Sequence, residues 1–238
     1  MEAMEANVRE IVFDEYMRKI KDGEVFQQAN YGDGEWQVIL GWVGKGNSDK
    51  ITYTQHMTDV LKDTLVDGHF THYGTNCGQK ILNAVKVHII ENKLQELDWV
   101  YKETLTNANC NGYIGWFFKE MKRREVVIIG GEHLSNLDII PNAEFIPVPR
   151  YDAFETYIET GQKILKHIDR KPILLFSAGF MTNATMHYLL KCYPETRNLF
   201  MIDMGAIFDP YVGVWSRSKY KKEEWQKTTL LKNIEDSK

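Results

Sequence analysis

The 238-residue sequence lacks any run of about 18 apolar residues, the length that a membrane-spanning helix requires. Its acidic, methionine-rich start also lacks the basic and apolar regions of a signal peptide. The three cysteines lie far apart and form no Cys-x-x-Cys pair, which disfavours a disulfide framework or a zinc knuckle. We therefore expect a cytoplasmic protein with free thiols and no membrane span.

Two nucleotide-binding motifs and a basic charge balance are also missing. The chain contains neither Gly-x-Gly-x-x-Gly nor Gly-x-x-x-x-Gly-Lys-[Ser/Thr], which disfavours a dinucleotide oxidoreductase and a P-loop enzyme. A net charge of −4 argues against a generally nucleic-acid-binding surface. Hydrophobic residues make up 43% of the chain, enough for a sizeable core, so we expect residues 1–238 to form a single domain.

The second half of the chain alternates apolar strands with amphipathic helices. Apolar runs, the first rich in β-branched residues, predict buried strands at 126–129, 173–176 and 199–202. Helical spacing predicts helices between them, at 154–168 and 182–193. Because strand, helix and strand follow one another at this spacing, the strands should be parallel. The expected fold class is α/β, a Rossmann-like layered sheet of mostly parallel strands flanked by helices.

Ligands of such sheets bind outside the carboxyl ends of the strands, so the residues that follow the strands are candidates for one site. These candidates are Gly130, Gly131, Glu132, His133, Ser177, Gly179, Asn183, Asp203 and Gly205. Small residues after strands also serve tight turns without any ligand, so no single position identifies a site.

The first half contains two acidic residues, Asp33 and Glu35, each preceded by a glycine. Hard divalent cations such as Mg²⁺ and Mn²⁺ prefer oxygen ligands, and one or two carboxylates suffice when phosphates and water complete the coordination shell. Gly32 and Gly34 lack a Cβ, so a phosphate can approach the backbone closely. The stretch therefore fits a metal-and-phosphate site, or else an ordinary surface turn.

Other segments of the first half have simpler interpretations. Helical spacing of apolar residues predicts helices at 5–21 and 55–66. Residues 36–40 form an apolar run of either strand or helix type. The glycine-rich residues 41–49 predict a loop, placed where it could cover a donor.

Two histidines, His69 and His72, lie three residues apart. A zinc site would need a third and a fourth ligand, and no nearby cysteine or histidine has convincing spacing. We interpret residues 67–74 as a polar loop.

The stretch Tyr31-Gly32-Asp33-Gly34-Glu35-Trp36 resembles the aromatic-Gly-Asp-Gly-Glu-aromatic signature of the GT-D-type glycosyltransferases, whose Asp-x-Glu motif serves a metal-bound nucleotide sugar. Later segments extend the resemblance from residue 26 to about residue 215. Gly130-Gly131-Glu132 is similar to the family's Gly-Pro-Glu, and Ser177-Ala178-Gly179 to its glycine-rich turn. Residues 201–205 resemble its Ile-Asp-Ile-Gly ending, and Asp209-Pro210-Tyr211 is a common continuation.

Two positions depart from the family pattern. Asn30 occupies a position where family members often have arginine, and Gly131 one where proline is usual. The missing arginine reduces the contacts expected to the donor phosphates, but it leaves the acidic pair unchanged.

The resemblance implies metal-dependent transfer of a sugar from a nucleoside diphosphate sugar, with UDP as the expected nucleotide, to a hydroxyl acceptor. Asp33 and Glu35 would hold Mn²⁺ or Mg²⁺, with Glu35 as the more direct ligand. An inverting enzyme also needs a base for the acceptor hydroxyl, for which Glu132, His133 and Asp209 are candidates. The expected donor-binding residues are Tyr31, Gly32, Gly34, Gly130, Gly131, Ser177, Gly179, Asn183, Asp203 and Gly205.

Two other function classes remain open. A metal-dependent phosphohydrolase would use the same carboxylates, with water in place of the acceptor. A non-catalytic module would bind a nucleotide sugar without turning it over.

Residues 215–238 are expected to form a C-terminal helix or tail, in which cations alternate with aromatics. Trp215, Arg217 and Lys219 are candidates for binding an acceptor, either a glycan or DNA that carries a hydroxylated base. The alternative is the solvated face of a terminal helix, with Trp215 and Trp225 packed inward.

Overall fold

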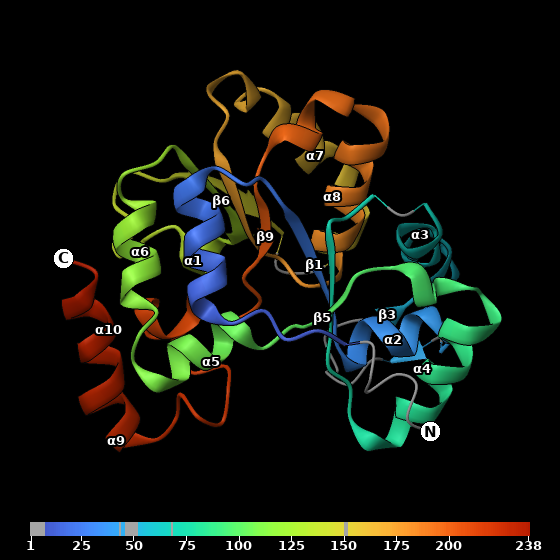
Figure 1. Cartoon of the computed structure of the whole chain (residues 1–238), viewed down its shortest axis with the longest axis horizontal. Helices are drawn as coiled ribbons and strands as arrows, with labels where there is room; N and C mark the ends of the chain where they lie inside the picture. The colour runs from blue at the N-terminus through green and yellow to red at the C-terminus, as the bar shows by residue number, and fades with distance from the viewer. Residues whose placement is uncertain (1–7, 43, 46–51, 68, 150–151) are drawn as a thin grey trace.

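The computed structural model describes residues 8–42, 44–45, 52–67, 69–149 and 152–238. These described residues form a seven-stranded sheet in the order β5-β4-β1-β9-β8-β6-β7, in which every neighbouring pair is parallel (Figure 1). The α/β class and the parallel sheet predicted from the sequence are thereby confirmed. No helix in these ranges is long and apolar enough to cross a membrane.

The elements have the following bounds. The strands of the sheet are β1 (Gln27–Tyr31), β4 (His72–Thr75), β5 (Trp99–Tyr101), β6 (Val126–Gly131), β7 (Glu144–Val148), β8 (Ile173–Ser177) and β9 (Met201–Asp203), and a separate antiparallel ribbon pairs β2 (Gly44–Lys45) with β3 (Thr52–Tyr53). The helices are α1 (Phe13–Asp22), α2 (Asp33–Ile39), α3 (Gln55–Val66), α4 (Gln79–Glu91), α5 (Thr104–Asn111), α6 (Gly115–Met121), α7 (Tyr157–Leu165), α8 (Phe180–Cys192), α9 (Glu223–Trp225) and α10 (Leu231–Asp236).

The core consists of two layers, one on each face of the sheet. Successive side chains of a strand point to opposite faces, so Val127 and Ile129 of β6 join one layer while Val126 and Ile128 join the other. Helices α2, α3, α4, α7 and α8 cover the first face, and α1, α5 and α6 cover the second. Burial on both faces explains why β6 and β8 are continuous apolar runs.

The strands expected at 126–129, 173–176 and 199–202 are present as β6, β8 and β9. The helix expected at 55–66 is present as α3, and the ambiguous run 36–40 belongs mainly to helix α2.

The N-terminal helix begins later than the sequence predicted. It starts at Phe13, because Arg9 bridges to Val100 and donates its backbone N–H to the carbonyl of Trp99 at 2.8 Å. The expectation of a helix from residue 5 was therefore wrong over residues 8–12, and residues 5–7 lie outside the described residues.

The sequence predicted loops at residues 67–74 and 41–49. Residues 67–74 are not one polar loop, since His72 begins β4 and pairs beside β1. Most of the glycine-rich segment 41–49, expected to be a loop over the donor, lies outside the described residues.

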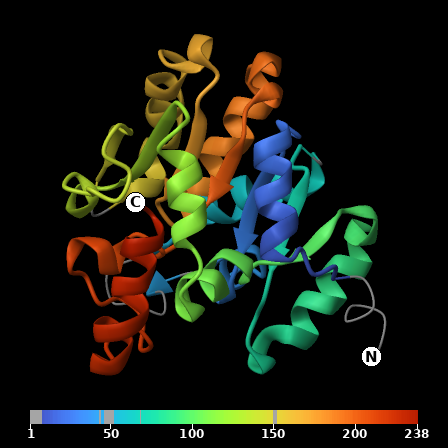
Figure 2. The same cartoon turned by 60° about the vertical axis from the view of Figure 1, so that its left-hand side comes forward.

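The C-terminal segment is packed onto the second face of the fold. The chain makes turns through Lys222 and is helical from Glu223 to Asp236, where a π-helical segment joins α9 to α10. Asn233 is fully buried and donates its amide to the carbonyl of Asn109 at 2.9 Å. Both views show this red segment beside α5 and α6 (Figures 1 and 2). The segment is therefore an integral part of the fold and not a loose tail.

Gly115 provides a test of this packing. A Cβ at Gly115 would lie 2.5 Å from the backbone oxygen of Asn233 and 2.6 Å from the Cβ of Asp236. Because a backbone oxygen cannot rotate away, α6 and α10 would have to separate. We expect Gly115→Ala to lower the free energy of unfolding by about 1–2 kcal/mol in urea denaturation. The exposed Arg123→Ala on the same side of the fold should change it by less than about 1 kcal/mol. Equal values for the two variants would show that α10 is not held at this crossing.

Candidate functional site

The acidic motif lies at the carboxyl end of β1, an interior strand of the sheet. Gly32 follows β1 and caps α2, so Asp33 and Glu35 lie in the first turn of that helix. Ligands of parallel sheets bind at this edge, and the N-terminus of a helix favours negative charge. The acidic pair therefore lies at the carboxyl edge of the sheet, where the sequence analysis expected ligands to bind.

Each carboxylate of the pair already accepts a backbone hydrogen bond. Glu35 Oε2 accepts the N–H of Gly32 at 2.8 Å, which closes one half of a capping box. Gly32 has no side chain, so it contributes no reciprocal bond. Asp33 Oδ1 accepts the N–H of Gly78, which precedes α4, at 2.7 Å. These bonds fix both side chains while leaving each carboxylate with a second oxygen.

Protein side chains occupy the space beside both glycines of the motif. A Cβ on Gly32 would overlap Lys102 Nζ and lie 3.2 Å from Glu35 Oε2. A Cβ on Gly34 would lie 2.8 Å from the ring of Phe180, the first residue of α8. The sequence suggested that these glycines admit a phosphate, but the structure gives the space beside them to Lys102 and Phe180.

Lys102 is a cation of the site that the sequence did not reveal. It follows β5, and its stem passes Gly74, where a Cβ would lie 3.0 Å from the Cβ of Lys102. Its ammonium group lies beside Gly32 and is 3.9 Å from Glu103 Oε1. A positive charge is therefore present at the acidic motif, although Asn30 lies where GT-D-type glycosyltransferases often have arginine.

Asp203 ends β9, the strand next to β1, and is only 9% exposed. Its carboxylate accepts the N–H groups of Gly205 at 2.9 Å and of Asn30 at 3.3 Å. The pKa of Asp203 is raised to about 7, chiefly by burial and also by the charge of Glu35, while the two backbone hydrogen bonds and Lys102 oppose the shift. Asp203, Glu35 and Lys102 therefore interact electrostatically at one edge of the sheet.

Two of the predicted donor-binding side chains are fully buried. The Tyr31 ring lies in the core, where its hydroxyl is 2.8 Å from Thr64 Oγ1. Asn183 is also fully buried and donates to the carbonyl of Asn30 at 3.1 Å. Asn30 in turn donates its side-chain amide to the carbonyl of Asp203 at 2.9 Å. These side chains connect the ends of β1, β9 and α8 and do not line the surface.

The turns after β8 and β9 join at the same edge. Ser177 donates its hydroxyl to the carbonyl of Gly205. Gly179 has φ +57° and Gly205 has φ +53°, in the region that favours glycine. The 13-residue helix α8 begins directly after Gly179, so its free N–H groups face this edge.

A histidine and a carboxylate from separate turns meet beyond β6. His133 Nε2 lies 3.1 Å from Asp209 Oδ1, and Asp209 is only 7% exposed. Two of the three candidate bases therefore form a pair, while Glu132 is exposed. Gly130 and Gly131 end β6 with little space beside them, since a Cβ on Gly130 would lie 2.7 Å from Leu134. The end of β6 is three strands from β1, roughly 14 Å along the edge at about 4.8 Å per strand.

A cavity of about 500 Å³ lies on the other side of the acidic motif, at the ends of β4 and β5. Thr75, Cys77 and Tyr101 contribute to its lining, and Gly78, which binds Asp33, is next to it in the chain. The volume falls in the range of small-molecule sites, roughly 300–1,000 Å³. The sequence gave no sign of this cavity, since its walls come from three separate segments.

The proposed acceptor residues lie before the C-terminal helix. Trp215 is half-buried against the cluster of Tyr220 and Trp225, while Arg217 and Lys219 are exposed. The inward packing of both tryptophans agrees with the alternative interpretation, and the two cations remain on the surface.

The acidic motif fits a divalent ion with an incomplete protein shell. Among the described residues, only Asp67, His69 and His187 place three ligand atoms of this kind within 4.8 Å of one another, so the motif itself does not supply three. Mg²⁺ and Mn²⁺ commonly use one or two carboxylates and take their other ligands from phosphates and water. The second oxygens of Asp33 and Glu35 match that chemistry.

Comparison with known proteins identifies the fold. No family model matches the chain, and no curated protein matches it.

Three solved structures are similar. A selenomethionine-substituted structure of domain of unknown function 1792 (DUF1792) has a TM-score of 0.58 and 14% identity, over 94% of this chain and 95% of that one. The same values apply to a DUF1792 structure described as having a distinct glycosyltransferase fold. A DUF1792 glycosyltransferase from Streptococcus sanguinis has a TM-score of 0.56 and 13% identity, over 86% of this chain and 83% of that one. The chain therefore has the glycosyltransferase fold of these proteins, as the resemblance of its acidic motif to the GT-D type implied.

Proposed function

We propose that this protein is a metal-dependent glycosyltransferase that uses a nucleoside diphosphate sugar, with UDP as the nucleotide. The observation that carries the proposal is the placement of Asp33 and Glu35, beside Lys102, at the carboxyl end of β1. The glycosyltransferase fold of the similar structures supports the same reaction class.

The reaction breaks an anomeric bond and leaves negative charge on a diphosphate. A divalent ion bound by Asp33 and Glu35 would neutralise that charge as it develops. The Lys102 ammonium group lies beside Gly32 and would contact a donor phosphate bound there. The N–H groups at the start of α8 offer further donors to phosphate oxygens.

The acceptor hydroxyl must lose a proton in an inverting reaction. In the His133–Asp209 pair, the imidazole donates its Nε2–H to Asp209, which leaves Nδ1 with a free lone pair. We propose that Nδ1 of His133 takes the acceptor proton and that Asp209 orients the ring. The acceptor is a hydroxyl group of a glycan, or of DNA that carries a hydroxylated base.

A substitution at His133 tests this assignment. His133→Gln removes the basic nitrogen, so we expect kcat to fall roughly 10²-fold. Donor affinity should stay within about threefold, because the ring is not assigned to donor binding. The matched variant Glu132→Gln changes an exposed neighbour and should retain activity. If Glu132→Gln loses activity and His133→Gln retains it, the base assignment is wrong; if neither loses activity, the enzyme uses no base here.

A titration followed by an assay tests the function as a whole. Purified protein is titrated with UDP, GDP, ADP and their sugar conjugates, with Mn²⁺ or with excess chelator. Nucleoside diphosphate release is then measured with and without glycan acceptors. We expect metal-dependent binding of a UDP species and acceptor-stimulated release of UDP.

Acceptor-independent hydrolysis of the phosphate ester would instead identify a phosphohydrolase, and binding without release under all conditions would identify a binding module. Equally tight binding in excess chelator would refute the metal requirement.

A further inference from the structure

A second cluster of chemically active side chains lies at the opposite edge of the sheet from the acidic motif. Asp67 caps the C-terminus of α3, and His69 lies between α3 and the start of β4. His187 projects from the last two turns of α8. Because β4 runs parallel to β1, its start lies at the amino edge, away from Asp33 and Glu35. The cluster is therefore separate from the proposed catalytic site.

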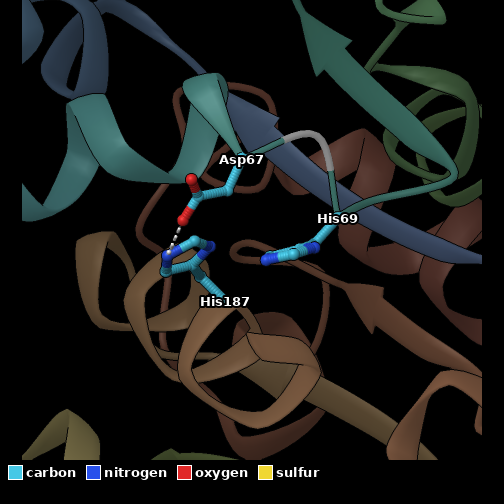
Figure 3. A group of neighbouring side chains, drawn as sticks. All are labelled: Asp67, His69 and His187. Atoms are coloured by element: carbon cyan, nitrogen blue, oxygen red, sulfur yellow. Dashed lines mark ion pairs between the residues drawn. The ribbon is translucent and has the colours of Figure 1, made fainter. Parts of the chain in front are cut away.

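The three side chains converge on one point (Figure 3). One ligand atom from each lies within 4.8 Å of the other two. His187 Nε2 is 3.4 Å from Asp67 Oδ2, and the two imidazole rings are 5.3 Å apart with an interplanar angle of 32°. In a tetrahedral zinc site with bonds near 2.0–2.2 Å, ligand atoms are roughly 3.5 Å apart, so these side chains need to close by only about 1 Å.

Two ring nitrogens in this cluster have no partner. His69 Nε2 and His187 Nδ1 are both buried and make no hydrogen bond within the described residues. His187 is only 6% exposed. Buried polar atoms are normally hydrogen-bonded, so two unsatisfied nitrogens in one cluster call for an explanation. A cation bound to both of these nitrogens would provide one, and the N–H of His187 would then be at Nε2, which faces Asp67 Oδ2 at 3.4 Å.

The residues around the cluster act on its titratable groups. Burial lowers the pKa of His187 to about 4 and also lowers the pKa of His69. A hydrogen bond from Lys191 lowers the pKa of Asp67, which keeps its carboxylate charged. Lys191 Nζ lies 2.8 Å from Asp67 Oδ2, and its side chain is 50% exposed. This ion pair alone explains the position of Asp67, but it leaves the two imidazole nitrogens unexplained.

We propose that Asp67, His69 and His187 form a second metal site, which binds Zn²⁺ and joins the end of α3 to α8. Two imidazoles and one carboxylate are a donor set that suits zinc, with water as the fourth ligand, whereas Mg²⁺ and Ca²⁺ prefer oxygen alone. The N-terminus of α8 contacts the acidic motif through Phe180, so the site would hold the far end of the same helix. Its role is structural.

Zinc binding and thermal stability test the proposal directly. Full-length protein is freed of metal with a chelator that is then removed, and titrated with ZnCl₂ by calorimetry. Co²⁺ is added separately as an optical probe of coordination. We expect one equivalent of Zn²⁺ to bind and raise Tm, and Co²⁺ to give visible bands typical of four-coordinate nitrogen and oxygen ligation. His69→Gln should weaken Zn²⁺ binding more than about 100-fold, since even an outer-shell partner contributes roughly 10- to 100-fold.

Control variants separate this site from the acidic motif. His69 is only partly buried, so His69→Gln should fold even if His187→Gln does not. His88→Gln, on α4, should bind Zn²⁺ as the wild type does. Glu35→Gln should also retain it, and His69→Gln should retain Mn²⁺-dependent nucleotide binding. Undiminished zinc binding in His69→Gln, or no binding by the wild type, would overturn the proposal without bearing on the glycosyltransferase assignment. Loss of zinc binding in Glu35→Gln would also overturn it, because the ion would then lie at the acidic motif.

Discussion

Replacing Glu35 with glutamine is expected to lower nucleoside diphosphate release about 10²–10³-fold, because the proposed transition state loses a charge that holds its cation. Glutamine keeps the size of glutamate and an oxygen that can still accept the N–H of Gly32, at present 2.8 Å from Glu35 Oε2. The start of α2 should therefore remain intact while the charge is removed. Steady-state assays with Mn²⁺ measure the loss, and calorimetry measures the accompanying decrease in metal-dependent donor affinity.

Two further variants separate the loss of the Glu35 charge from the loss of its hydrogen bond and from the general effect of neutralising a glutamate. Glu35→Ala removes the hydrogen bond as well as the charge, so it should also cost about 1 kcal/mol of unfolding free energy as a lost helix cap. Glu96→Gln neutralises an exposed glutamate away from the motif and should leave both activity and stability unchanged. If Glu35→Gln turns over the donor at the wild-type rate, Glu35 does not hold the metal. If all three variants are active in excess chelator, no metal takes part in the reaction.

The sequence predicted those parts of the fold in which local pattern and burial agree. β6 and β8 are apolar runs because helices cover both of their faces, so composition alone indicates them. The acidic motif was noticed because its spacing resembles a known signature, although the strand that precedes it was not predicted. Neither inference needed any knowledge of distant contacts.

β1, on which the site is built, was missed because its burial depends on distant partners. Its sequence, Gln-Gln-Ala-Asn-Tyr, is too polar to indicate a buried strand. Gln27 is nonetheless 5% exposed, since its amide donates to the carbonyls of Arg197 and Leu199 at 2.9 and 3.0 Å. Those partners lie about 170 residues further along the chain. β4, which begins at a histidine, was misread as a polar loop for a similar reason.

Long-range contacts also hid several residues of the candidate sites. Lys102 reaches the acidic motif from the end of a three-residue strand, which no local pattern marks. His69 and His72 are close in the sequence, but His72 contacts Asp98, and the histidine that lies next to His69 is His187 of α8. Predicting such groupings requires the strand order, which the sequence does not state.

Asp203→Asn is expected to change how stability depends on pH. The pKa of Asp203 is about 7 in the folded protein against an ordinary value of 3.8, because the carboxyl is buried next to the charge of Glu35. The folded state therefore holds this proton more tightly than the unfolded state. The contribution of this bound proton to the free energy of unfolding is fully present below about pH 4, and it is lost as the pH rises through about 7. Asparagine does not titrate, so it avoids this loss.

Urea denaturation of both proteins at pH 5 and pH 8, in excess chelator, measures the effect. Asparagine presents an N–H₂ group to one of the two N–H donors that Asp203 accepts, from Gly205 and Asn30, which costs about 1–3 kcal/mol at either pH. At pH 5 the variant should therefore be the less stable protein. Its deficit should shrink by about 2–3 kcal/mol at pH 8, since one pKa unit corresponds to about 1.4 kcal/mol.

The difference between the two pH values isolates Asp203, because the pH-independent cost cancels. A deficit that stays constant within about 0.5 kcal/mol would mean that Asp203 ionises as an ordinary carboxylate, and its burial at the end of β9 would then need another explanation. The Glu35→Gln background provides an internal check. Since the charge of Glu35 is one cause of the raised pKa, removing it should reduce the pH-dependent change. A smaller change in that background would establish that the two carboxyl groups interact across the ends of β1 and β9.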